Sequence, residues 1–271
     1  MSTATNTATV KVRQRSKLYW ALADGFVLAR RNLVQIPRIP ELLVFATIQP
    51  VMFVLLFRYV FGGAIDVGGE SYADYLMAGI FVQTVAFGGI STGVGLSEDL
   101  HKGLVDRFRS LPMARSAVLT GRTIADLVRN LFVVLVMLLV GLLVGFRPDA
   151  GLAGWARAIG LLLLLSFSFS WIGATIALLM RSTEAVQSAG FIWLFPLTFA
   201  SSAFVQTENM PGWLEAFANR QPMTQVIDAV RAFLLDQPVG SHGWQALAWC
   251  LGLLVVFIPF SVSLYRRVAA R

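Results

Sequence analysis

Several runs of about 20 mostly apolar residues divide this chain, and they constrain its fold more than any other feature. A helix of that length spans the hydrocarbon layer of a membrane, which is about 30 Å thick. Hydrophobic residues make up 56% of the 271 residues and charged residues only 14%, whereas soluble domains carry about 25% charged residues. We therefore expect an all-α membrane protein rather than a water-soluble globule.

Six of these runs are long and apolar enough to form membrane-spanning helices. The polar, Thr-rich residues 1–16 contain no apolar run, and we expect them to form a disordered tail. Residues 17–271 then form one transmembrane domain. The six expected spans are residues 42–61, 74–96, 118–145, 158–180, 189–205 and 244–265.

The basic residues predict which way the spans run. Most of the 22 Lys and Arg residues lie in the tail and in the connections on the same side as the N-terminus. Because basic residues accumulate on the cytoplasmic side of membrane proteins, both termini are expected in the cytoplasm. This bias also accounts for the net charge of +7 without a nucleic-acid partner. The opposite side carries only Arg58, Arg147, Arg157, Arg220 and Arg231.

An amphipathic segment precedes the first span. Between residues 17 and 36, apolar residues such as Leu18, Leu22 and Phe26 recur every three or four positions. Pro37 ends the pattern. We expect a helix that lies along the inner leaflet, although a helix that packs only against its own protein fits the same pattern.

Some chemistries have no support in the sequence. The single Cys250 permits neither an internal disulfide nor a cysteine metal cluster, and His101 and His242 are too far apart for a local zinc motif. Neither a phosphate-binding G-x-x-x-x-G-K-[ST] loop nor a dinucleotide-binding glycine motif occurs. We therefore expect no catalytic residues, no metal site and no cofactor bound by this chain itself.

Residues 89–93 match the G-x-S-x-G pattern of serine hydrolases, with Ser91 as the nucleophile. That motif requires a turn between a strand and a helix, together with a histidine and an acid. Here it falls inside an apolar helix, so Gly89 and Gly93 are better interpreted as a small-residue face for close helix packing.

A polar connection between the second and third spans is the most informative stretch of the chain. Ser97 can cap a helix, and acidic residues follow it in the expected first turn. Pro112 marks the expected end. The apolar residues between these positions form one stripe that is too short to span a membrane. We expect a short cytoplasmic helix, while a connector that merely covers the helix ends is the alternative.

The spacing of this connection resembles a known family. The pattern Glu98-Asp99-(x)3-Gly103-(x)3-Arg107-(x)3-Leu111-Pro112 after the second of six spans is similar to that of type 2 ABC transporter permeases, of the daunorubicin-resistance export type. The resemblance implies a coupling helix, within residues 97–112, that docks on a separate ATP-binding subunit. Carried over to this chain, the coupling residues are Glu98, Asp99, Gly103, Leu104, Arg107, Phe108, Arg109, Leu111 and Pro112.

The resemblance also implies a set of partners. Two copies of the ATP-binding subunit would bind ATP and Mg²⁺, and a second permease, either identical or related, would complete the path for the cargo. Membrane lipids surround the assembly. A compositional bias towards Ala, Val, Leu, Gly and Arg favours a bacterial source, and hence the bacterial cytoplasmic membrane.

Two further groups of residues are candidate functional sites. Asp126 and Arg129 are three residues apart in the third span, where they can pair, and we expect them near its cytoplasmic end. On the fifth span, aromatic residues form a stripe that could contact a flat amphiphilic cargo, although such a stripe also suits lipid or a neighbouring helix. The candidate cargo residues are Phe191, Trp193, Phe195 and Phe199, with Ser166, Ser168 and Ser170 on the fourth span.

The segment 206–243 before the last span is expected on the outer side. Residues 223–235 form an amphipathic pattern. In the family that this chain resembles, short re-entrant or interfacial helices occupy this place and shape the exit. A simple surface cap is the alternative.

These observations predict the permease subunit of an ATP-driven exporter of a hydrophobic drug, lipid or lipid-linked molecule. A transporter or flippase driven by an ion gradient, without an ATPase, is the main alternative. An intramembrane serine hydrolase that uses Ser91 and a membrane scaffold without transport activity are the others.

Overall fold

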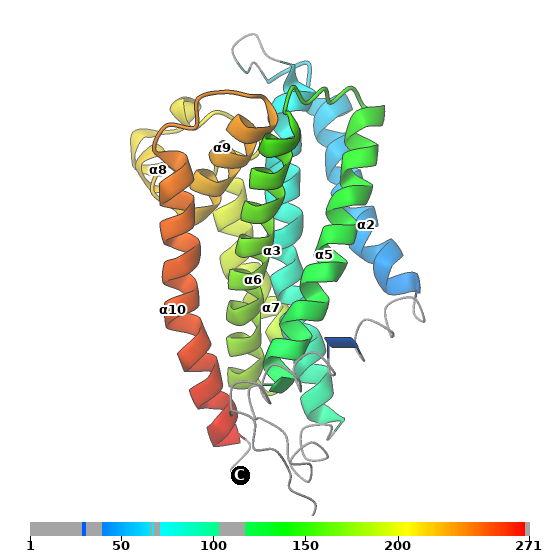
Figure 1. Ribbon diagram of the computed structural model, residues 1–271, viewed down its shortest axis with the longest axis vertical. Coiled ribbons are helices and arrows are strands. Elements are labelled where there is room, and N and C mark those ends of the chain that lie inside the picture. Colours follow the sequence, from blue (N-terminus) through cyan, green and yellow to red (C-terminus); the bar gives the residue numbers. More distant parts are fainter. Residues whose placement is uncertain (1–28, 31–39, 66, 68–70, 103–116, 269–271) are drawn as a thin grey trace, which may run out of the picture.

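The computed structural model describes residues 29–30, 40–65, 67, 71–102 and 117–268 (Figure 1). Within these ranges the chain forms helices and connecting turns without a strand, which confirms the all-α prediction for this part of the protein. The expected tail at 1–16 and nearly all of the expected interfacial helix at 17–36 lie outside the described residues.

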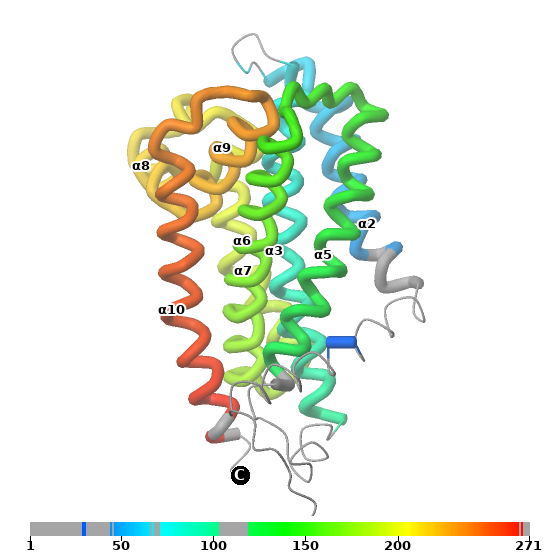
Figure 2. The backbone as a smooth tube through the Cα atoms, viewed as in Figure 1, coloured from blue at the N-terminus to red at the C-terminus, as the bar shows by residue number. Residues whose placement is uncertain are grey.

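The long helices run roughly along one axis, side by side (Figures 1 and 2). The short helices η3 (Thr207–Asn209), α8 (Gly212–Ala218) and α9 (Pro222–Leu234) lie together at one end. The C-terminal end of α10 (His242–Val268) lies at the other. The long elements are α2 (Pro40–Leu55) with its π-helical continuation η2 (Leu56–Phe61), α3 (Tyr72–His101), α5 (Ala117–Leu143), α6 (Leu152–Leu179), α7 (Thr183–Phe199) and α10 (His242–Val268).

Four of these helices, α3, α5, α6 and α10, are long and apolar enough to cross a membrane. The other two predicted spans are also helical, but shorter. The apolar part of α2 and η2 covers residues 46–61, and α7 has 17 residues. The fifth predicted span is displaced, because α7 begins at Thr183 and ends at Phe199 instead of covering 189–205.

The prediction that Ser97 begins a separate helix is wrong. Helix α3 continues without interruption from Tyr72 to His101. The Ser97 side chain is buried, and its hydroxyl lies 3.5 Å from the Thr183 hydroxyl. Ser97 therefore helps pack α3 against α7, and Glu98 and Asp99 belong to the last turn of α3.

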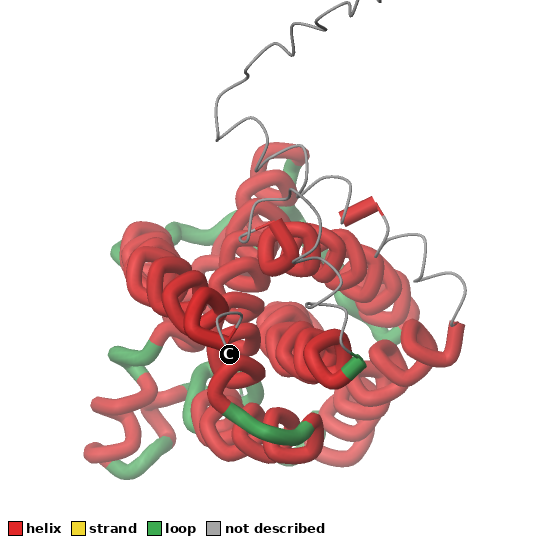
Figure 3. Tube along the Cα trace, turned by 90° about the horizontal axis from the view of Figure 1, so that it is seen from below, coloured by secondary structure: helices red, strands yellow, loops and turns green. Residues whose placement is uncertain are grey.

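Helix α3 forms the centre of the bundle, and most of its residues are buried. Figure 3, which looks along the bundle from below, shows the other helices arranged around a central one. Small residues permit this packing. A Cβ on Gly93 would lie 2.6 Å from the Gly173 carbonyl oxygen of α6, and one on Gly173 would overlap the Gly89 carbonyl. The predicted small-residue face of α3 is thereby confirmed.

The serines of α6 hold helices together. Ser166 accepts a hydrogen bond from the Asn130 amide at 2.7 Å, and Ser168 donates one to the Cys250 carbonyl oxygen at 3.1 Å. Ser170 lies 3.2 Å from the Thr92 hydroxyl. All three serines are fully buried, so their predicted contact with cargo is not supported.

The outer faces of the peripheral helices are apolar. On α5, Val128, Phe132, Leu135 and Leu139 are all exposed at helical spacing. Helix α10 exposes a similar row that includes Leu251 and Val255. Exposed apolar faces of this extent are stable against lipid rather than water, so the protein is a multi-pass membrane protein.

Helix α9 is inserted into the end of the bundle. Its residues Val226, Ile227 and Val230 are fully buried. Its polar side is also buried, because Arg231 donates hydrogen bonds to Asp228 and to the carbonyl oxygens of Ser202 and Tyr75. The Arg231 guanidinium also lies 3.7 Å from the centre of the Tyr75 ring. A simple surface cap would leave its polar side in water, so α9 is a packed part of the bundle. Whether it is a re-entrant or an interfacial helix stays a prediction.

Candidate functional site

A chain of alternating charges joins α3 to α5. Asp99, in the last turn of α3, pairs with Arg122 of α5 at 2.8 Å. Arg122 lies 3.7 Å from Asp126, which in turn pairs with Arg129 at 3.0 Å. We refer to Asp99, Arg122, Asp126 and Arg129 as the charge ladder. All four side chains are at most 20% exposed, so solvent screens these pairs less than surface pairs.

Glycines on α3 make room for the ladder. A Cβ on Gly95 would overlap the Arg122 guanidinium, and one on Gly88 would overlap the Asn130 amide. The close approach also lets Arg129 donate a hydrogen bond to the Gly88 carbonyl oxygen at 3.3 Å. Side chains of α5 thus lie directly against the α3 backbone over the two turns from Gly88 to Gly95.

The sequence predicted only one of the ion pairs in this ladder. The expected pairing of Asp126 with Arg129 is confirmed. The sequence does not predict the pairing of Asp99 with Arg122, because the two residues are 23 positions apart in the chain and no local pattern reveals that their helices are in contact. The i, i+4, i+7 spacing of Arg122, Asp126 and Arg129 was the available signal, since it places all three on one face of a helix.

The ladder extends from the first turns of α5 to its middle. Arg129 is twelve residues after Ala117, the first residue of the 27-residue helix α5, and therefore about 18 Å along it. Arg129 therefore lies near the middle of α5, and Asp126 lies about one turn closer to its start. Their expected position near the cytoplasmic end of the span stays a prediction.

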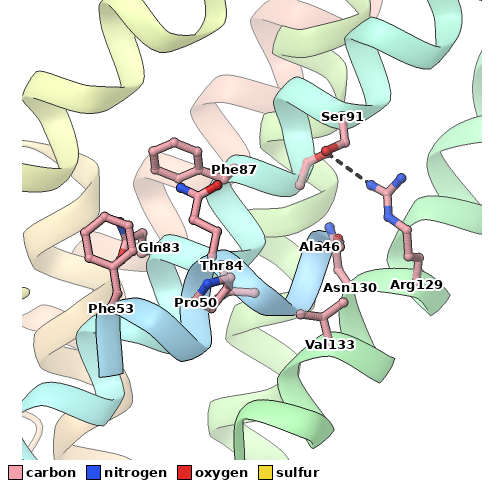
Figure 4. Close-up of a pocket in the computed structure, with 12 residues that line it drawn as sticks. Ala46, Pro50, Phe53, Gln83, Thr84, Phe87, Ser91, Arg129, Asn130 and Val133 are labelled. Carbon is pink, nitrogen blue, oxygen red and sulfur yellow. Dashed lines mark hydrogen bonds between the residues drawn. The ribbon is translucent and has the colours of Figure 1, made fainter. Parts of the chain in front are cut away.

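A cavity of about 80 Å³ lies beside the Arg129 end of the ladder, between α2, α3 and α5. Arg129 and Asn130 line it from α5, and Gln83 and Ser91 from α3. The rings of Phe53 and Phe87 lie on its other side (Figure 4). The cavity combines hydrogen-bond donors with aromatic faces, although no sequence pattern brought these residues together.

The end of α3 is also connected to the turn between α6 and α7. The His101 ring lies 3.0 Å from the Arg181 carbonyl oxygen and 2.7 Å from that of Ser97. Lys102 pairs with Glu98 at 3.2 Å, but both side chains are largely exposed. Of the predicted coupling residues the structure describes Glu98 and Asp99. The others, Gly103, Leu104, Arg107, Phe108, Arg109, Leu111 and Pro112, lie outside the described residues.

Ser91 lacks the surroundings of a hydrolase nucleophile. It lies within α3 rather than at a turn between a strand and a helix. His101 is ten residues further along the same helix, about 15 Å away, and His242 begins α10. Within the described residues no cluster of His, Cys, Asp and Glu could hold a metal ion.

The predicted aromatic stripe of α7 divides into separate contacts. Phe195 stacks on Phe199 with ring centres 4.3 Å apart, and Phe199 lies 5.2 Å from Phe204. Trp193 instead packs against Phe169 of α6, and Phe191 against Phe87 of α3. The ring of Phe57 in η2 stacks on Phe204 at 4.2 Å, so the aromatic cluster joins α7 to the first span.

Several proteins with similar sequences are named as permeases. The chain is 36% identical over 241 residues to the daunorubicin resistance ABC transporter permease protein DrrB1 of Streptomyces coeruleorubidus, covering 88% of this chain and 84% of that protein. It is 29% identical over 230 residues to the probable doxorubicin resistance ABC transporter permease protein DrrC of Mycobacterium tuberculosis, covering 83% and 81%. A putative transport permease, ycf38 of Cyanophora paradoxa, is 25% identical over 219 residues, covering 79% and 74%.

The sequence profile of one family covers most of the chain. It is described as ABC-2 type transporter and matches residues 24–235. This range includes the charge ladder, the cavity and helix α9. The chain therefore belongs to the ABC-2 type transporter family, whose members are the membrane permease subunits of ABC transporters.

Proposed function

We propose that this chain is the permease subunit of an ATP-driven exporter that moves a hydrophobic drug, lipid or lipid-linked molecule out of a bacterial cell. Six spans, with α2–η2 and α7 as the first and fifth, would cross the cytoplasmic membrane with both termini inside. A separate ATP-binding subunit, present in two copies, would bind ATP and Mg²⁺, and a second permease would complete the path. The chain would then hydrolyse no ATP by itself.

The pairing of Asp99 with Arg122 is the observation that carries this proposal. These residues lie on the two helices that flank the expected coupling segment, because α3 ends at His101 and α5 begins at Ala117. Their pair at 2.8 Å ties the two helix ends together. A partner that pushes on the segment between them would therefore move α3 and α5 as one unit.

The path for the cargo follows from the aromatic cluster. Phe195 is 49% exposed, and its ring begins a row of stacked rings that continues through Phe199 to Phe204. Aromatic faces contact apolar rings without requiring hydrogen bonds. The relatives named for daunorubicin and doxorubicin resistance support a flat aromatic cargo of this kind.

The docking of the ATP-binding subunit can be tested directly. The variants Leu104→Asp and Phe108→Asp place a charge on the expected docking face, and Phe217→Asp places one in α8 at the opposite end of the bundle. We expect the first two variants to lose capture of the ATP-binding subunit and doxorubicin export from cells, and the third to keep capture of the subunit. If both coupling variants bind the subunit and export the drug as the unchanged protein does, the proposal is wrong.

A transporter driven by an ion gradient is the second candidate. Asp126 favours it, because this acid lies nine residues, or about 14 Å, into α5, and acidic residues inside spans often mark ion pathways. Reconstitution of the chain without any ATP-binding subunit tests this alternative. Cargo movement that follows an imposed proton or sodium gradient in such vesicles would support it over the ATP-driven mechanism.

A further inference from the structure

The cavity between α2, α3 and α5 contains a buried polar group without a partner. The Gln83 side chain is only 4% exposed, and its amide nitrogen has no hydrogen-bond partner in the described part of the protein. Leaving a buried amide unpaired is costly, so such a group calls for an explanation. Gln83 lines the cavity, where a ligand oxygen could accept its hydrogen bond.

Arg129 adds a second donor to the same cavity. Its hydrogen bond to the Gly88 carbonyl oxygen is 3.3 Å long, whereas most such bonds measure about 2.9 Å. A guanidinium carries five N–H groups, and its ion pair with Asp126 leaves others to turn towards the cavity. Arg129 can therefore bind an oxygen acceptor without giving up its place in the charge ladder.

The opposite side of the cavity is aromatic. Phe53 of α2 and Phe87 of α3 face the space across from Arg129 (Figure 4). A volume of about 80 Å³ holds a small polar group with part of a ring, but not a large molecule. The rest of a larger ligand would extend into the lipid beside α2, whose residues Ile48 and Met52 are exposed.

We propose that this cavity is a binding site for the oxygen-bearing end of an aromatic amphiphile dissolved in the membrane, with a carboxylate or carbonyl oxygen held by Gln83 and Arg129 and the ring between Phe53 and Phe87. The acceptor oxygen could belong to the exported cargo or to an anionic lipid. The site extends the proposed function by adding a cargo contact beside the aromatic cluster of α7, because Phe87 packs against Phe191 and Phe53 lies near Phe199.

The test uses a tritiated probe, 4-dodecyloxybenzoate, and the purified full-length protein in phosphatidylcholine nanodiscs. Scintillation proximity gives the affinity. We expect Arg129→Gln to weaken probe binding about tenfold or more, and Gln83→Leu about threefold or more, because each change removes one donor to the carboxylate. The matched control is Arg157→Gln, an exposed arginine of α6, which should leave the affinity unchanged.

The charge of the probe provides a second measurement. The corresponding benzylamine has the same ring and chain with the opposite charge, so it should compete at least about tenfold more weakly than the benzoate. Gln83→Leu leaves the ladder charges in place and therefore remains informative if Arg129→Gln fails to fold. Equal affinity of Gln83→Leu, Arg129→Gln and the unchanged protein, or equal competition by amine and benzoate, would overturn the proposal.

Nanodiscs that contain phosphatidylglycerol distinguish the two sources of the oxygen. If the site takes a lipid headgroup, this lipid displaces the probe from the unchanged protein. If the site takes cargo, probe affinity is equal in both lipids. Either result supports the acceptor site and identifies its source. The assay contains no ATP-binding subunit, so its failure would leave the docking proposal standing, and a failure of docking would leave the binding result standing.

Discussion

Arg122 connects acids from two helices, which makes it the central residue of the charge ladder. It contacts Asp99 of α3 at 2.8 Å and lies 3.7 Å from Asp126 on its own helix. Its guanidinium occupies the space beside Gly95, which must be a glycine because a Cβ there would overlap the guanidinium. Removing Arg122 would leave two mostly buried carboxylates without their shared partner, which costs more than the pair itself contributes.

The ion pair between Asp99 and Arg122 should stabilise the fold. We expect Arg122→Gln to lower the free energy of unfolding by about 1–3 kcal/mol, because Asp99 and Asp126 lose a charged donor. Chemical unfolding in detergent measures the effect. The double variant Asp99→Asn with Arg122→Gln should lose less than the sum of the two single variants. Strictly additive losses would show that the two side chains do not interact.

Residue-level reasoning from sequence succeeded where partners lie on one helix. Asp126 and Arg129 were paired from their spacing, as the structure shows. It failed for Asp99 with Arg122 and for the cavity around Gln83, because these contacts depend on how α2, α3 and α5 pack. It also failed at Ser97, because a residue type that caps helices here packs inside one.

At the scale of elements, glycines set how closely α3 and α6 approach. Gly173 of α6 faces the Gly89 carbonyl oxygen, with no space for a Cβ. Gly160, on the same helix, has no atom within 4 Å of where a Cβ would lie. The two positions therefore separate the effect of packing from the effect of helix propensity.

Alanine should therefore have opposite effects at Gly173 and Gly160. We expect Gly173→Ala to lower the free energy of unfolding by about 1–3 kcal/mol, because α6 must move away from α3. Gly160→Ala should be neutral or stabilise the protein by up to about 1 kcal/mol, because alanine favours helix more than glycine does. Thermal unfolding of both variants checks this. Equal effects at the two positions would contradict the close approach of α3 and α6.

The third prediction concerns α9. Arg231 is 8% exposed and donates hydrogen bonds to Asp228, Ser202 and Tyr75. Arg231→Met should therefore cost about 3 kcal/mol, because Asp228 loses this charged partner and the two carbonyl oxygens lose a donor. Amide hydrogen exchange in residues 222–234 should accelerate, since α9 loses its anchor to α3. Arg220→Met, at an exposed arginine two residues before α9, is the control. Unchanged exchange in the Arg231 variant would argue against the anchoring role.

At the scale of the whole molecule, the bundle has two distinct ends. The end of α3, the start of α5 and the C-terminal end of α10 lie together (Figure 1). Helices α8 and α9 lie at the opposite end. The distribution of basic residues predicted this division from sequence. The end at which a connection lies depends on how many spans precede it, and not on how the helices pack. The displaced bounds of α7 left that division intact.

The fourth prediction tests which end faces the cytoplasm. In a Cys250→Ala background, Lys102→Cys and Trp213→Cys place one thiol at each end of the bundle. A maleimide that cannot cross membranes should label Trp213→Cys in intact cells, because Trp213 is 75% exposed in α8. It should label Lys102→Cys only after the cells are opened. The reverse pattern would invert the proposed orientation.

We propose that the segment between α3 and α5 receives force from an ATP-binding subunit. Cysteine cross-linking in membranes tests it most directly, with Leu104→Cys in the Cys250→Ala background and the subunit co-expressed. We predict a cross-link between Leu104→Cys and the ATP-binding subunit whose yield changes when ATP is bound, and none from Trp213→Cys. A Leu104→Cys variant that reacts only with lipid-soluble reagents and never with the subunit would contradict the account.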